Sequence, residues 1–246
     1  MPKTGGPVTA DRIADVAAAA RILAARGVVD GFGHVSMRHP DAPDRYLMSR
    51  ALAPAIVTPS DIVEYDLESE ACDPAAPKGF LERFIHGQIY KARPDVCAVV
   101  HSHSPSVIPF GLTKTPMQAC FHNAAFLAQG VPVFDIACDH GATDMLVSDN
   151  DKGVALAECL SDKPVALMRA HGSVACGPSL EVAVFRAVYT EVSARVQHWA
   201  LALAEDGEEL ATLSKEEGVL ADVPNQTAGL RAWDLWRAEI REKAGW

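Results

Sequence analysis

The residues of this chain best suited to metal chemistry include two histidines close together in the sequence. His101 and His103 form a His-x-His pair that ends the apolar run 96–100. Residues two apart in a strand project to the same face of a sheet. We therefore expect both imidazoles to be available to one ion.

A third histidine follows a second apolar run. His171 comes after the run from Pro164 to Met168 and leads into Gly172, which is typical of a strand that ends in a loop. Three neutral imidazoles with a carboxylate or water suit a divalent ion such as zinc, manganese or iron, and an open position would make the site catalytic. Hydrogen-bonded core histidines have the same spacing, so spacing alone leaves both interpretations open.

These histidines need a scaffold of alternating helices and strands. The chain has 246 residues with 49% hydrophobic content, enough for one large domain with a single core. Thr9 to Arg26 is predicted to be a helix, with Thr9 as its N-cap and Gly27 as its stop. Strands are expected near 34–38, 45–48 and 62–67, and a surface loop at 69–78. A helix that carries Glu82 is expected from Phe80 to before Pro94. Helix and strand signals then alternate over 119–129, 131–136, 147–160 and 165–168, and a helix follows from Leu180 to about Ala204.

The pattern changes after Asp206. A charged stretch is followed by an expected break at Pro224 and by a segment that ends in Trp246. Trp233, Trp236 and Ile240 recur at helical spacing, which predicts an amphipathic helix. We divide the chain into a main domain, 1–205, and a helical extension, 206–246, packed on that domain or on a neighbouring subunit; an aromatic ligand-binding patch is the alternative.

Composition excludes several classes of protein. A net charge of −10 argues against a general nucleic-acid binder. No apolar run approaches a membrane span and no signal-peptide pattern opens the sequence, so we expect no membrane partner and a cytoplasmic location. The six cysteines form no CxxC pair, which favours buried free thiols over disulfides or a zinc knuckle.

Three segments resemble the signature of the class II aldolase/adducin family. They are the run from Glu82 to Pro105, Gly33 to Arg38, and Ala170 to Gly172, in the family's order and at about its spacing. The resemblance runs from about residue 10 to residue 205. It implies an α/β fold, a three-layer αβα sandwich around a mostly antiparallel central sheet. It also implies a homotetramer with active sites between subunits.

The resemblance assigns roles to the candidate ligands. In the family, residues at the positions of Glu82, His101, His103 and His171 surround one divalent metal ion. The carboxylate can leave the metal to act as an acid or a base. The chain is therefore expected to be a metal-dependent carbon–carbon lyase.

One departure from the family pattern concerns the substrate. Sugar-phosphate aldolases of the family hold phosphate with a Ser-Ser pair, an Asn and a Thr-Pro-(Ser/Thr)-Gly turn. Here the pair is Phe80-Leu81, the Asn position is His34, and the turn region is 48–54. Since a phosphate dianion would be poorly solvated among these side chains, we expect an unphosphorylated substrate.

The same positions suggest a flatter carboxylate ligand. Phe80 and Leu81 suit a less polar molecule, while His34, Ser49 and Arg50 are placed to meet a small-molecule carboxylate. Core packing is the alternative for Phe80 and Leu81, and a surface salt bridge is the alternative for Arg50. The combination resembles the branch of decarboxylases that act on hydroxylated aromatic or pyridine carboxylates.

Two residues are candidates for proton transfer. Glu82 is the first and His122 the second, because His122 lies near the position of a tyrosine acid that aldolases of the family receive from another subunit. The alternative for His122 is a helix-face histidine at a subunit contact. His86, four residues after Glu82, is placed to hydrogen-bond that carboxylate, with a structural role as the alternative.

Decarboxylation of a hydroxylated aromatic or heteroaromatic carboxylate is the activity we favour. An aldolase for an unphosphorylated hydroxy-keto acid or aldehyde is the runner-up, because the same metal shell supports both reactions. An iron-dependent oxygenase and an adducin-like binding module without catalysis are further alternatives. The complete set of four ligand-type residues argues against the last of these.

Overall fold

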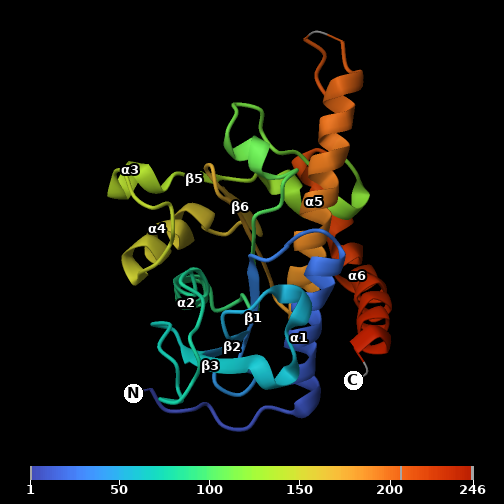
Figure 1. Ribbon diagram of the computed structural model, residues 1–246. Coiled ribbons are helices and arrows are strands. Elements are labelled where there is room, and N and C mark those ends of the chain that lie inside the picture. Colours follow the sequence, from blue (N-terminus) through green and yellow to red (C-terminus); the bar gives the residue numbers. More distant parts are fainter. Residues whose placement is uncertain (1, 206, 245–246) are drawn as a thin grey trace.

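The computed structural model describes residues 2–205 and 207–244. The protein has three layers, with one sheet between two layers of helices (Figure 1). The sheet order is β3-β2-β1-β4-β7-β6-β5, and all neighbouring pairs are antiparallel except the parallel pair β5–β6. The strands are β1 (His34–Arg38), β2 (Arg45–Ser49), β3 (Ile62–Asp66), β4 (Ala98–Ser102), β5 (Val133–Phe134), β6 (Val165–Met168) and β7 (Gly172–Gly177). The expected αβα sandwich with a mostly antiparallel sheet is confirmed.

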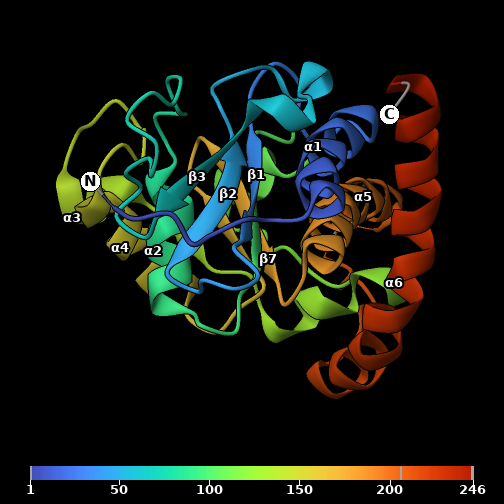
Figure 2. The same ribbon diagram turned by 90° about the horizontal axis from the view of Figure 1, so that it is seen from below.

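Helices cover both faces of the sheet. The α-helices are α1 (Ala10–Ala25), α2 (Phe84–Ala92), α3 (Ile136–His140), α4 (Asn150–Leu160), α5 (Leu180–Leu203) and α6 (Lys215–Ala244), and the 3-10 helices are η1 (Pro54–Ile56), η2 (Pro59–Asp61), η3 (Ile108–Gly111) and η4 (His122–Gln129). Helices α1 and α5 pack on one face of the sheet, with α6 outside them, while α2 and α4 lie on the other face (Figure 2). Each face has its own apolar cluster.

The first helix follows from its sequence signals. The Thr9 side chain accepts a hydrogen bond from the backbone N–H of Arg12, as an N-cap should, and Gly27 adopts a φ of 71° just after the helix. An alanine-rich face including Ala17 and Ala18 lies fully buried against the sheet. The short side chains allow close approach, so α1 packs directly on strands β1, β2 and β3.

Two expectations about helices are wrong. Helix α2 begins at Phe84, so Glu82 lies in the turn before it rather than on the helix. The backbone N–H of Ile85 bonds to the Glu82 carbonyl in an i to i+3 contact, at 3.1 Å, which makes this entry a tight turn. Helix α6 runs through Pro224 without the expected break.

Contacts with the body explain why α6 continues. The Asn225 side chain donates to the backbone carbonyl of His122 at 2.7 Å, and Asp222 pairs with Arg186 of α5. These contacts hold the helix on either side of the missing proline N–H. Trp233, Trp236 and Ile240 are buried in the cluster on the α1 and α5 side, whereas residues 206 and 246 lie outside the described residues.

Candidate metal centre and pocket

Four side chains from three separate places converge at one end of the sheet. His101 is the next-to-last residue of strand β4 and His103 directly follows the strand, while His171 occupies the tight turn between β6 and β7. Because β4 and β7 pair with Ser102 opposite Ser173, the β6–β7 turn sits beside the end of β4. Glu82 reaches the same point from the turn before α2. The sheet register therefore assembles the group.

The ligand atoms are close enough to share one ion. One nitrogen or oxygen atom from each of Glu82, His101, His103 and His171 lies within 4.8 Å of the others. His103 Nε2 is 3.0 Å from both His101 Nε2 and His171 Nε2. Glu82 Oε2 is 3.5 Å from His101 Nε2 and 3.4 Å from His171 Nε2. All four atoms face a common centre.

Contacts behind the cluster orient two of its members. His101 Nδ1 lies 3.1 Å from the Ser173 carbonyl, to which it can only donate, so the lone pair of a neutral His101 is on Nε2 and faces the cluster. Glu82 Oε1 accepts from the backbone N–H of Val147 at 2.9 Å, which directs Oε2 to the histidines. Both groups thus present acceptors to the shared centre.

The loop after β4 is anchored from the opposite layer. Glu191 of α5 is buried, and its carboxylate accepts hydrogen bonds from the hydroxyls of Ser104 and Ser106. These contacts fix the chain directly after His103. The position of that imidazole is consequently set by α5 as well as by the sheet.

The charge state of the cluster suits a divalent cation. Burial and the neighbouring histidines lower the pKa of His103 to about 4, which leaves its imidazole neutral near neutral pH. Burial by itself would raise the pKa of Glu82, but His101 and His171 outweigh it and the net shift is downward. Imidazole nitrogens with an ionised carboxylate form a donor set that fits zinc, manganese or iron.

A pocket of about 500 Å³ opens beside this cluster. Its walls are mainly apolar, and the polar groups are few. The lining residues are Gly31, Phe32, Gly33, His34, Ala51, Leu52, Ala53, Lys78, Gly79, Phe80, Leu81, Glu82, His101, His103 and Leu146. The predicted substrate residues His34, Phe80 and Leu81 are thus placed around one cavity with three of the four ligand candidates.

His34 lies directly beside the ligand cluster. It pairs with His101 across β1 and β4, and its ring centroid is 5.0 Å from that of His101 and 4.7 Å from that of Phe80. Its Nδ1 is 2.7 Å from His86 Nε2. Burial is the main cause that lowers the pKa of both His34 and His86, so both rings are neutral. His86 contacts His34 rather than Glu82, contrary to the expected contact.

Three other predicted residues lie away from the pocket lining. Ser49 is buried at the end of β2, opposite Ile62. The Arg50 guanidinium donates to Asp61 Oδ1 at 2.7 Å, which is the salt-bridge alternative. His122 is exposed at the start of η4 and does not line the pocket.

Some pocket residues had no signal in the sequence. Lys78 supplies a cation from the acidic, proline-rich loop, and Phe32 and Leu146 add apolar surface. Leu146 precedes the backbone N–H that holds Glu82. These residues come from irregular segments, where neither periodicity nor a motif predicts position.

No helix within the described ranges is long and apolar enough to cross a membrane.

The chain matches the class II aldolase and adducin N-terminal domain over residues 14–198. It is 36% identical over 239 residues to Decarboxylase tropJ of Talaromyces stipitatus, with 89% of this chain and 90% of that protein covered. It is 30% identical over 267 residues to 3,4-dihydroxyphthalate decarboxylase of Arthrobacter keyseri, with 100% of both chains covered.

A solved structure agrees on the fold. The aldolase II superfamily protein from Pseudomonas syringae superimposes with a TM-score of 0.79 at 21% identity, over 97% of this chain and 95% of that one. The matched segment includes all four converging ligand candidates. The chain belongs to the class II aldolase and adducin family.

Proposed function

We propose that this protein is a metal-dependent carbon–carbon lyase that decarboxylates a hydroxylated aromatic or heteroaromatic carboxylate. The observation that carries the proposal is the Glu82, His101, His103 and His171 cluster beside a largely apolar cavity of about 500 Å³. A flat ring fits such walls, and a hydroxyl and a carboxylate on adjacent ring carbons suit a cation at the cluster.

The relatives support the same reaction class. Decarboxylase tropJ and 3,4-dihydroxyphthalate decarboxylase are named for decarboxylation, and each match covers most of both chains. Phe80 and Leu81 stand where phosphate-binding hydroxyls would be expected in sugar-phosphate aldolases. Both line the pocket. The pocket therefore favours a ring over a phosphorylated sugar.

The residues around the pocket have distinct proposed roles. Glu82, His101, His103 and His171 hold the divalent ion, zinc, manganese or iron, which when bound supplies Lewis-acid stabilisation of oxygen charge. We assign to the Glu82 carboxylate the acceptance of the proton of the ring hydroxyl and the delivery of that proton to the ring carbon that bears the carboxylate. The carbon–carbon bond then breaks, carbon dioxide leaves, and the ring regains aromaticity as a phenolate.

We also propose a homotetramer in which a neighbouring subunit brings His122 to the pocket as a second proton-transfer group. The exposure of His122 supports this arrangement. Mixing His122→Ala and His103→Ala subunits tests it. Hybrid tetramers should regain activity that neither parent shows, whereas inactive hybrids would place His122 outside the reaction.

Carbon dioxide release provides the test of the reaction. Metal-stripped protein is assayed with hydroxylated benzoates, phthalates and pyridine carboxylates, with and without zinc, manganese or iron(II), beside a His103→Ala control. Metal-dependent release that the control lacks is the expected result. Cleavage of an unphosphorylated hydroxy-keto acid without carbon dioxide release would instead identify an aldolase.

A further inference from the structure

A buried chain of hydrogen bonds leads from the pocket into the protein interior. Its first link joins His34 Nδ1 to His86 Nε2 at 2.7 Å. His86 Nδ1 then lies 2.6 Å from Ser36 Oγ, which is 2.7 Å from the Tyr90 hydroxyl. All four residues are buried, and His34, which is 6% exposed, is the one of the four that lines the pocket.

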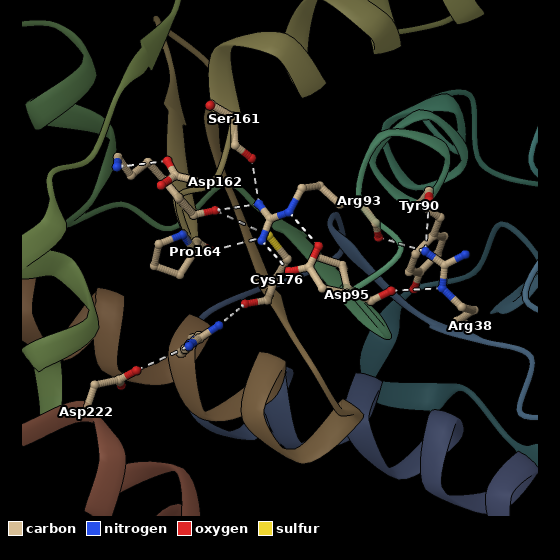
Figure 3. A network of polar contacts seen from close by, with 12 residues as sticks. Arg38, Tyr90, Arg93, Asp95, Ser161, Asp162, Pro164, Cys176 and Asp222 are labelled. Carbon is tan, nitrogen blue, oxygen red and sulfur yellow. Dashed lines mark hydrogen bonds and ion pairs between the residues drawn. The ribbon is translucent and has the colours of Figure 1, made fainter. Parts of the chain in front are cut away.

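Arg38 connects strand β1 and helix α2, the two elements that carry these hydrogen-bonded residues. His34 and Ser36 share one face of β1, and His86 and Tyr90 are one turn apart on α2. The Arg38 guanidinium donates to the backbone carbonyls of Tyr90, at 2.8 Å, and Arg93, at 2.9 Å, and lies 4.7 Å from the Tyr90 ring centroid (Figure 3). The end of α2 is thereby tied to β1.

The hydroxyl groups determine the direction of the hydrogen bonds. Within the described part of the chain, the Tyr90 hydroxyl contacts one acceptor, Ser36 Oγ, so it donates to it. Ser36 then has one acceptor for its own proton, His86 Nδ1. The opposite direction would leave the buried Tyr90 O–H without an acceptor, which proteins avoid.

The proton of each neutral imidazole is placed by this direction. Since His86 accepts at Nδ1, its proton is on Nε2 and is donated to His34 Nδ1. The His34 proton must then be on Nε2. That atom has no hydrogen-bond partner among the residues the structure describes and is not among the fully buried unpaired atoms, so it is open to the pocket.

We propose that Ser36 and His86 are positioning residues that hold His34 in its Nε2–H tautomer, so that His34 presents a fixed donor to a carboxylate oxygen of the substrate. The substrate part of this inference rests on the proposed function. The tautomer does not depend on it. His34 is then a recognition group for an anion, whereas its other tautomer would present a lone pair to that anion.

Nitrogen-15 solid-state NMR of protein labelled with ¹⁵N-histidine tests the tautomer without substrate. The His34 signals are identified by their absence in His34→Asn. The expected result is a protonated Nε2 and an unprotonated Nδ1. A proton on Nδ1 of wild-type His34 would overturn the proposal. This result does not depend on whether variants of Tyr90, Ser36 or His86 fold.

Two variants test the direction of the chain. Ser36→Ala removes the donor to His86, so signals of both His34 tautomers are expected. Tyr90→Phe should keep the Nε2–H form, because the Ser36 hydroxyl still needs His86 Nδ1 as its acceptor. If His34 in Ser36→Ala still showed the Nε2–H tautomer alone, the proposed control of His34 by Ser36 would be refuted.

Kinetics test the contact with substrate. If half of the His34 rings in Ser36→Ala carry the proton on Nδ1, KM for the hydroxyaromatic acid rises about twofold while kcat is unchanged. Tyr46→Phe is the matched control: it removes a buried hydroxyl that bonds to Ser69 instead. Equal KM changes in both variants would show a packing effect. A wild-type protein that releases no carbon dioxide would overturn the proposed function and leave the tautomer result standing.

Discussion

At the residue scale, the two oxygens of Glu82 have different partners. Oε1 is held by the backbone N–H of Val147, and Oε2 faces His101 and His171. The first contact fixes the carboxylate, and the second places its charge beside imidazole nitrogens. The proposed roles of Glu82, as a metal ligand and as the proton-transfer group, therefore both fall on a carboxylate that the backbone holds in place.

Glu82→Gln removes the negative charge of the side chain and keeps an oxygen that can accept from the backbone N–H of Val147. The amide oxygen can still accept from Val147, so the fold should be kept, but the anionic ligand and the base are lost. We expect bound metal, measured by elemental analysis, to fall below stoichiometry. Carbon dioxide release should fall about a hundredfold or more. Glu64→Gln, on β3 and away from the cluster, is the control; equal losses in both variants would contradict this role for Glu82.

Phe80 is expected to determine the choice of substrate. Replacing its ring with the hydroxyl of Phe80→Ser removes apolar contact worth about 1.4 kcal/mol, so KM for an aromatic acid should rise roughly tenfold with kcat within about threefold. Steady-state kinetics measure both constants. Leu112→Ser changes an exposed leucine outside the pocket lining and should leave KM unchanged. An unaltered KM in Phe80→Ser would place the ring of the substrate elsewhere.

Residue types predicted the ligand candidates better than the substrate contacts. The His-x-His pair and His171 lie beside strand ends, where pairing of β4 with β7 brings them together. Arg50 was expected to meet a carboxylate, and it pairs with Asp61 eleven residues later. Which acid reaches an arginine depends on how the β2–β3 hairpin folds back, and sequence spacing does not contain that information.

At the element scale, α6 shows how tertiary contacts override local propensity. Pro224 predicts a break because it lacks an N–H, yet anchoring of Asp222 and Asn225 to the body keeps the helix continuous. Helix α1 is the opposite case, since its cap and its stop act within a few residues. Local signals therefore predicted α1, whereas α6 depends on contacts far apart in sequence.

The attachment of α6 can be measured through its tryptophans. Trp236 is 6% exposed, and the Arg26 guanidinium lies 5.3 Å from its ring centroid. Trp236→Ala should lower the free energy of unfolding by about 3 kcal/mol, measured by urea denaturation. Trp199→Ala is the control, because Trp199 is 64% exposed, and should change stability by less than about 0.5 kcal/mol. Similar losses in the two variants would mean that α6 does not depend on its buried face.

At the scale of the whole molecule, the candidate metal centre joins parts of the fold that are far apart in sequence. Its ligands come from the turn before α2, the end of β4 and the β6–β7 turn. The unfolded chain does not hold these groups together. Metal binding should therefore stabilise the folded state of the entire domain.

Thermal unfolding measures this coupling. A divalent ion at one hundred times its Kd should add about 2.7 kcal/mol, which corresponds to a rise in Tm of roughly 5–10 °C for a chain of this size. Differential scanning calorimetry compares metal-loaded and chelator-treated protein. His103→Ala should lose most of the rise. A metal-dependent increase that persists in this variant would locate the stabilising ion at another site.

The contact between Val147 and Glu82 has a consequence for mutational scanning. Val147 is fully buried, so alanine substitution would score it as an ordinary core position. The group that orients the carboxylate is its peptide N–H, which nineteen of the twenty genetically encoded residues retain. Proline alone deletes it. The orientation of Glu82 in the candidate metal centre thus depends on a backbone group, and a comparison of side chains among relatives would not reveal that dependence.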